Sequence, residues 1–225
     1  IAATNKPYDK YSVNPTQFFN IQSPEIAYIL GILWADGHVQ AHFNHKNHPH
    51  YRVTLSTTYP DIDEILPTFL KTGKWSVHEK KTYSKKHKRA FGINTSNRPL
   101  TEFLISKDYK TKSWDSADKI LKEIPEHLRH YWFRGLVDGD AHIAKDCITI
   151  YSGYEQNWNY IETLCHKLDI KYSINRRIRN CGGSGEITIR KKQGLKTFLD
   201  YIYQNRENDK IGLSRKYYHY RSLFF

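Results

Sequence analysis

Ala27-Tyr-Ile-Leu-Gly-Ile-Leu-Trp-Ala-Asp36-Gly-His38 is the stretch that decides the fold, because a related stretch follows later as Tyr131-Trp-Phe-Arg-Gly-Leu-Val-Asp-Gly-Asp140-Ala-His142. Aligned without a gap, the two stretches pair Gly31 with Gly135, Asp36 with Asp140 and His38 with His142. Each is an apolar run of helical length that ends in an aspartate. An internal repeat of this kind predicts two related halves, each built around one copy.

The charge balance indicates a polyanionic partner. The chain has 225 residues, with 35 Lys and Arg against 23 Asp and Glu, which gives a net charge of +12 and a pI of about 9.4. This excess favours nucleic acid, through the release of counterions from phosphates, and leaves an anionic membrane surface as the alternative. The hydrophobic content of 39% supports a folded core.

Two classes of protein are disfavoured. No apolar run approaches the roughly 20 residues that cross a bilayer, and the N-terminus has no signal-peptide pattern, so we expect an intracellular protein, cytoplasmic or organellar, that is not secreted. Cys147, Cys165 and Cys181 are odd in number and lack a C-x-x-C spacing. Neither a disulfide framework nor a structural zinc site is therefore indicated.

The pattern along the chain predicts an α+β fold with two four-stranded antiparallel sheets backed by helices. Residues 1–22 are predicted to form an extended N-terminal arm that packs its aromatic side chains onto the body, 23–108 the first half, 109–126 a linker with one short helix, and 127–225 the second half. Ser23 and Pro24 supply a helix start before the first repeat. Each half then reads helix, hairpin, helix, hairpin, helix, with hairpins predicted at 38–58, 74–96, 142–152 and 171–192.

Small residues form a stripe along the repeated stretches. The stripe has a helical spacing of four residues and consists of Ala27, Gly31, Ala35, Gly135 and Gly139. It lets two helix backbones approach closely. Taken alone, the stripe favours a tight helix pair in a core over a catalytic role.

The two aspartates favour a catalytic role. Asp36 and Asp140 end their helices, where the helix dipole is negative and an acidic side chain is disfavoured. If the helices pack side by side, the two carboxylates meet and demand a cation. Mg²⁺, which accepts few carboxylate ligands and keeps several waters, fits that demand. A metal between two carboxylates in a basic protein suits phosphodiester hydrolysis.

The two stretches resemble the paired motifs of single-chain LAGLIDADG homing endonucleases. The resemblance implies a pseudo-twofold duplicate of αββαββα halves, with the motif helices packed at the centre and the sheets forming saddles over double-stranded DNA. It also implies that Asp36 and Asp140 are catalytic metal ligands. The chain departs from the motif at Trp34, where an acidic or small residue is usual, and at Ala141, which replaces a final glycine.

The resemblance further implies a lysine late in each half that touches the active-site solvent. The best matches are Lys112 and Lys216, which lie at equal distances after their aspartates, with Lys210 as a substitute in the second half. A surface lysine on a basic protein is the alternative. Thr57 and Ser152 match positions where the family places a polar residue that organises water.

Alternation along the predicted strands presents polar side chains on one sheet face, a pattern suited to a β-ribbon in the DNA major groove. In the strand predicted at 171–179, the alternation turns Tyr172, Ile174 and Ile178 inward and turns outward Ser173, Asn175, Arg177 and Arg179. In the strand at 186–192, the outward residues are Thr188, Arg190 and Lys192. In the strand at 74–80, they are Lys74, Ser76, His78 and Lys80. A solvated sheet face is the alternative.

A second basic group is expected to grip phosphates at a hairpin tip, without reading sequence. It comprises Lys80, Lys81, Lys85, Lys86, His87, Lys88 and Arg89. Histidines also crowd the first hairpin at positions 38, 42, 45, 48 and 50. Their alternate spacing without cysteine favours a groove-facing surface over a zinc site.

These observations predict a monomeric, Mg²⁺-dependent endonuclease that cuts both strands of a long asymmetric DNA site. Mn²⁺ is expected to substitute for Mg²⁺, and Ca²⁺ to support binding without cleavage. The alternative is a cleavage-silent relative on the same scaffold, either an RNA splicing maturase or a DNA-binding regulator. Retention of both aspartates favours the enzyme.

Overall fold

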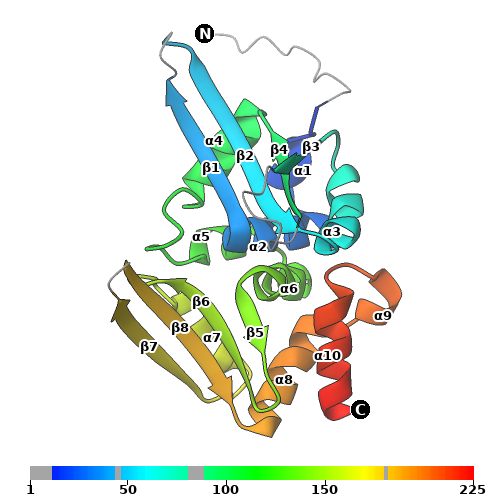
Figure 1. Ribbon diagram of the computed structural model, residues 1–225, viewed down its shortest axis with the longest axis vertical. Helices are drawn as coiled ribbons and strands as arrows, with labels where there is room; N and C mark the ends of the chain where they lie inside the picture. Colours follow the sequence, from blue (N-terminus) through cyan, green and yellow to red (C-terminus); the bar gives the residue numbers. More distant parts are fainter. Residues whose placement is uncertain (1–11, 44–46, 81–88, 180–181) are drawn as a thin grey trace.

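Residues 12–43, 47–80, 89–179 and 182–225 are described by the computed structural model (Figure 1). The prediction that the N-terminal arm is extended is only partly right for its described residues. It contains the short helix α1 (Thr16–Phe19), and Val13 forms a β-bridge to Gly73. Val13 and Phe18 are fully buried, so this segment packs onto the first half.

Two four-stranded antiparallel sheets with the same topology confirm the predicted α+β duplicate. The first sheet contains β1 (Gly37–Phe43), β2 (Pro49–Thr58), β3 (Ser76–Lys80) and β4 (Ala90–Thr95), in the order β1-β2-β4-β3. The second contains β5 (Ala141–Ile143), β6 (Cys147–Gly153), β7 (Tyr172–Arg179) and β8 (Gly182–Arg190), in the order β5-β6-β8-β7. The register also repeats, since Gly37 pairs with Leu55 and Ala141 with Ile150.

Each half supplies three matching helices. In the first half these are α2 (Pro24–Asp36), α3 (Asp61–Leu70) and α4 (Arg98–Ser106), and in the second α6 (Arg129–Asp140), α7 (Asn159–Lys167) and α8 (Lys192–Tyr203). The segment between the halves carries α5 (Asp118–Glu123) and a short 3₁₀ helix (Glu126–Leu128), and the chain ends with α9 (Arg206–Asp209) and α10 (Ser214–Phe224).

Local capping explains where two first-half helices begin. The Ser23 hydroxyl accepts a hydrogen bond from the Ile26 amide (3.3 Å), and the Asn97 side-chain oxygen accepts one from the Leu100 amide (2.9 Å). Each bond satisfies an amide that has no partner within its own helix. The start of α2 therefore lies where the sequence predicts it.

Helices α2 and α6 lie together at the centre of the molecule, between the first sheet above and the second below (Figure 1). Residues 26–34 of α2 and 130–138 of α6 are all buried. The C-terminal ends of both helices lead directly into the first strand of their own sheet. In the described part of the chain, no helix is long and apolar enough to span a membrane.

Candidate functional site

Backbone contact between α2 and α6 depends on the small-residue stripe. A methyl group on Gly31 would lie 1.9 Å from the carbonyl oxygen of Trp132, and one on Gly135 would lie 2.3 Å from that of Tyr28. Ala27 is fully buried, and a methyl group on Gly139 would lie 2.4 Å from the Cβ of Ala35. The two backbones therefore touch, and no larger residue fits at these glycines.

This contact brings the two motif aspartates together. Asp36 and Asp140 are the last residues of α2 and α6, and the Asp36 carboxylate lies 3.2 Å from the Cβ position of Gly139, the residue before Asp140. Burial, with repulsion from Asp36 as the second cause, raises the pKa of Asp140 to about 7. Partial desolvation also raises the pKa of Asp36, although its outer side is exposed to solvent.

The two predicted lysines cap the ends of these helices. The Lys112 ammonium donates hydrogen bonds to the carbonyls of Leu33 (3.2 Å) and Ala35. At the C-terminus of α2, these carbonyls have no amide partner in the helix. A positive charge here also offsets the negative end of the helix dipole.

Lys216 caps α6 in the same way and more completely. It donates to the carbonyls of Val137 (2.5 Å), Asp138 (2.8 Å) and Ala141 (2.7 Å), and it is only 8% exposed. Burial lowers its pKa, and burial lowers that of Lys112 to about 8 against the attraction of both motif aspartates. The predicted substitute, Lys210, lines a different cavity, between α3 and the α9–α10 region.

A cavity of about 200 Å³ opens beside Asp140. Lys112 lines it, together with Trp34, Ala35, Ser113, Tyr151, Ser152, Gly153, Gln156 and Tyr160. Ser152 donates a hydrogen bond to the side-chain oxygen of Gln156 (2.7 Å), whose amide donates to the carbonyl of Asp115 (2.7 Å). Polar groups and an ammonium therefore surround space next to one motif carboxylate. Thr57, the predicted counterpart of Ser152, does not line this cavity.

Gln156 is a candidate site residue that sequence reasoning missed. It is 1% exposed, and the amide is held by the Ser152 hydroxyl and two backbone carbonyls. No motif marks it. It lies three residues before the start of α7 at Asn159, and its partners are backbone and side-chain groups that no local pattern identifies.

The donor set at the helix ends fits a hard divalent cation. Neither the Asp36 nor the Asp140 carboxylate accepts a hydrogen bond from a residue in the described ranges, and a cation between the two carboxylates would relieve the repulsion that Asp36 exerts on Asp140. Among the described residues, no three or more His, Cys, Asp and Glu side chains group to hold a metal ion. Two carboxylates suit Mg²⁺, which keeps several waters, better than Zn²⁺.

Both departures from the motif are accommodated. Trp34 points into the core, where it is 3% exposed, and its ring packs edge-on against that of Tyr109 at 5.0 Å. It does not disturb the end of the helix. Ala141 has φ −98° and ψ 147°, an extended conformation open to any residue, so the glycine usual at this position is not needed.

Asp138 and Arg134 are buried charges that the sequence did not reveal. Asp138 accepts hydrogen bonds from the Tyr28 hydroxyl (3.0 Å) and the Leu213 amide (2.8 Å). Burial raises its pKa. Arg134 is fully buried and bonds Asp209 (2.9 Å) and three backbone carbonyls. The Tyr28–Asp138 bond joins the two central helices, and Arg134 ties α6 to the segment from Ile202 to Ile211.

In the first sheet, the predicted DNA-binding residues fall into three groups. Lys74 lies before β3 and is exposed, as is His78 within it, whose ring nitrogen lies 3.0 Å from the Asn94 amide nitrogen. Arg89 makes a bidentate ion pair with Glu79 (2.7 and 2.9 Å), and Lys80 bonds the Ser56 hydroxyl. Lys85, Lys86 and Lys88 lie outside the described residues.

In the second sheet, an outward polar group lies on β7 and β8. Asn175 and Arg177 are exposed, and both bond Glu186 on the neighbouring strand, at 3.4 and 3.1 Å. Arg190 is exposed at the end of β8. Arg179 is the last residue of β7, and its side chain lies outside the described part.

Two orientations predicted for this sheet are wrong, and one predicted strand residue lies in a helix. Thr188 is 1% exposed because it lies in a central strand and satisfies its hydroxyl against that of Thr149 at 3.1 Å. Lys192 is exposed, as predicted, but it begins α8, because β8 ends at Arg190. Ile178 is 79% exposed because its partner in the register is Gly183, which offers no side chain to cover it.

The histidine group lies on the first hairpin. His42 and His50 are direct partners across β1 and β2, and their ring centroids lie 4.9 Å apart. His38 and His142 are exposed at matching positions of β1 and β5. His45 is not among the described residues.

The fold is that of LAGLIDADG homing endonucleases. I-DmoI in complex with DNA and Ca matches with a TM-score of 0.60 at 13% identity, over 88% of this chain and 97% of that chain. I-LtrWI bound to target DNA matches at 0.54 and 13% identity, over 94% and 90%. I-SmaMI bound to cleaved DNA matches at 0.52 and 15%, over 90% and 87%. No protein-family model and no curated protein matches the chain.

Proposed function

We propose that this chain is a site-specific endonuclease that cuts both strands of DNA as a monomer, with divalent metal held by Asp36 and Asp140. The observation that carries the proposal is that backbone contact between α2 and α6 brings these two carboxylates close together at the ends of the helices. Such a site demands a cation, and the chain around it has a net charge of +12. The structural relatives include an I-DmoI variant with nicked target DNA and Mn.

The residues divide the chemical work. Asp36 and Asp140 would hold the metal, which when bound supplies a water of lowered pKa and stabilises the leaving oxygen. Lys112 keeps the end of α2 in place and lines the cavity beside Asp140. Ser152, fixed by Gln156, offers a hydroxyl in the same cavity that can orient water. Lys216 is buried against three carbonyls, so its role is to position α6.

The exposed polar side chains of the two sheets would bind the duplex. Asn175, Arg177 and Arg190 lie on the second sheet and His78 on the first, where Asn and Arg side chains can pair with base edges. Arg177 must exchange Glu186 for DNA, which makes it a candidate for reading one base. Lys74, Lys80 and Arg89 are placed for phosphate contacts. We expect the two unlike sheets to select an asymmetric site.

The decisive experiment measures cleavage of a randomised plasmid library, in a buffer with Mg²⁺, by the parent and by the variants Asp36→Asn and Asp140→Asn. Both variants should lose double-strand cleavage while retaining DNA affinity, because Asn keeps the shape but not the charge that holds the metal. Mn²⁺ should restore cleavage to the metal-free parent, and Ca²⁺ should support binding only. Full cleavage by either variant would refute the shared metal site.

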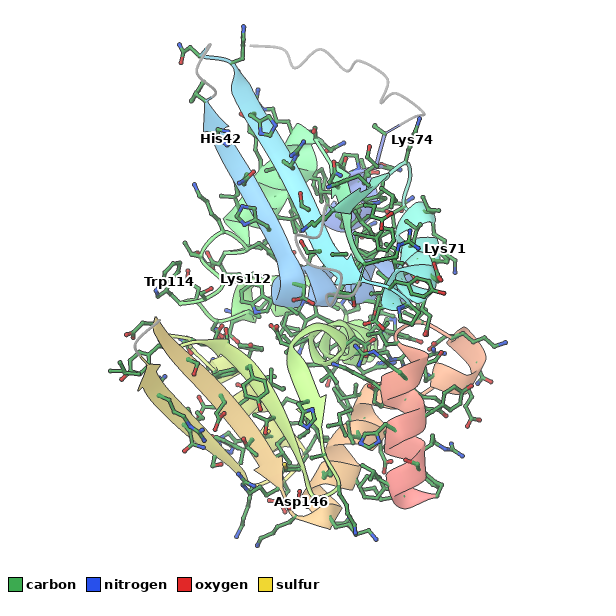
Figure 2. The ribbon with its side chains drawn as sticks, viewed as in Figure 1. His42, Lys71, Lys74, Lys112, Trp114 and Asp146 are labelled. Atoms are coloured by element: carbon green, nitrogen blue, oxygen red, sulfur yellow. The ribbon has the colours of Figure 1, made fainter. Side chains whose placement is uncertain are left out.

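Asp146→Asn is the matched control. Asp146 is exposed in the turn between β5 and β6, far from the central helices (Figure 2), and its loss should leave cleavage unchanged. Tight binding by the parent with no nicking at any site would contradict the endonuclease and favour a binding-only role as a maturase or regulator.

A further inference from the structure

Trp114 presents an exposed aromatic ring next to the candidate site. Its side chain is 59% exposed, whereas the other four tryptophans, Trp34, Trp75, Trp132 and Trp158, are at most 4% exposed. The backbone beneath it is fixed, because the Trp114 amide donates to the Thr111 carbonyl (2.9 Å) and its carbonyl accepts from the Asn157 amide (3.2 Å). In Figure 2 the indole projects outward at the margin between the two halves, beside Lys112.

The indole borders a cavity that suits a nucleotide. This cavity, of about 440 Å³, lies between β1 and the turn at 109–114, and it is lined by Gly37, His38, Val39, Gln40, Ala41, His42, Tyr109, Lys110, Lys112, Ser113 and Trp114. None of these residues is acidic. Two lysines and two histidines complement a phosphate, and the aromatic ring offers a stacking surface for a base or a sugar.

The second half has an aromatic residue at the matching position with opposite surroundings. Tyr218 follows Lys216 by two residues, as Trp114 follows Lys112, and it is 67% exposed. The cavity beside it has a volume of about 610 Å³, and its lining contains four acidic residues (Asp63, Glu64, Glu207 and Asp209) and three basic ones (Lys71, Arg206 and Lys210). The formal charges of this lining therefore sum to −1, whereas those beside Trp114 sum to +2, so the second cavity is less suited to phosphate and the two exposed rings are not equivalent.

We propose that Trp114 and the cavity beside it form a nucleotide-binding subsite, in which the indole stacks on a base or deoxyribose of the bound DNA. The subsite serves one flank of the cut site only. Lys110, exposed on the same turn, is placed to contact the adjoining phosphate. This inference rests on the proposed function and adds a contact outside the sheets that sets preference on one side of the target.

Tryptophan fluorescence tests the contact directly, because iodide reaches only an exposed indole. In the free protein, iodide should quench Trp114 emission, and a Trp114→Phe variant should show no quenchable emission. Adding the duplex recovered from the cleavage library, with Ca²⁺ to prevent cutting, should abolish quenching in the parent. If that duplex binds in a gel shift while Trp114 stays quenchable, the subsite is refuted and the proposed function stands.

Affinity provides the second measurement. Trp114→Ala should weaken binding of the same duplex about tenfold, and Trp114→Phe, which keeps a stacking ring, by less than about threefold. Tyr218→Ala is the matched control and should bind like the parent. Equal affinity for the parent and Trp114→Ala would overturn the subsite. Failure of every duplex to bind the parent would overturn the proposed function and the subsite together.

Discussion

Gly31→Ala should destabilise the protein, although alanine normally strengthens a helix. In a helix interior, alanine is favoured over glycine by about 1 kcal/mol. At Gly31, however, the new methyl group would lie 1.9 Å from the Trp132 carbonyl oxygen, and side-chain carbons essentially never approach closer than 3.0 Å. The obstacle is helix backbone, which cannot rotate away. The central helices must separate by about 1 Å.

The expected magnitude follows from these opposing effects. Overpacking of a core costs about 1–3 kcal/mol and occasionally more. Because a rigid carbonyl is the obstacle, we expect the upper end, about 3 kcal/mol, against the gain of about 1 kcal/mol in helix propensity. The net loss of about 2 kcal/mol corresponds to a fall in Tm of roughly 4–8 °C for a chain of this size.

Gly194→Ala is the matched control for this prediction. Gly194 lies within α8, where a methyl group would meet the Ile170 and Ile189 side chains at 3.4 and 3.8 Å, which are ordinary contact distances. This variant should gain about 0.5 kcal/mol in stability. Thermal and urea unfolding followed by circular dichroism measure both variants. A Tm for Gly31→Ala equal to or above that of the parent would refute the backbone contact.

Three further predictions concern buried charges. Arg134→Met should cost about 3–5 kcal/mol in urea unfolding, because it strands the Asp209 carboxylate and three carbonyls. Lys216→Met should lower the Tm more than Lys112→Met, because Lys216 satisfies three carbonyls and Lys112 two; equal losses would contradict this ranking. Burial lowers the pKa of His130 to about 4 from 6.5. Between pH 4 and 6.5, His130 therefore binds fewer protons in the folded state than in the unfolded state. The free energy of unfolding should fall by up to about 3 kcal/mol as the pH drops from 6.5 to 4. His130→Gln should flatten this slope, and an unchanged slope would exclude His130 as its source.

The sequence was sufficient to predict the features that depend on local pattern. The start of α2 at Pro24 follows from a serine cap and a proline, both of which act within one turn. The close helix contact follows from the four-residue spacing of Gly31 and its neighbours, because that spacing puts small residues on one face. The duplication then predicted the second sheet from the first.

The sequence was insufficient where a residue's environment comes from distant segments. Alternation turns Thr188 outward, but its burial depends on the strands on either side, and Thr149 is far away in the chain. The same alternation continues to Lys192, whereas the backbone leaves the strand at Lys191 with φ 67°. The burial of Asp138 and Arg134 had no local signal, because their partners lie far away in the chain, in α2 and in the α8–α10 region.

The lysine caps explain how two aspartates can stand at the negative ends of adjacent helices. Each helix end contributes roughly −0.5 charge and each ionised aspartate −1, so the helix ends and carboxylates alone would carry about −3. Lys112 and Lys216, bonded to the terminal carbonyls themselves, bring this to about −1. With a divalent cation bound, the net charge at the helix ends would be about +1, and a positive charge attracts a phosphodiester. The two lysines therefore reduce the repulsion between the helix ends and still leave negative charge to bind a metal ion. For this reason, the proposed site needs a lysine at each helix end as well as the two aspartates.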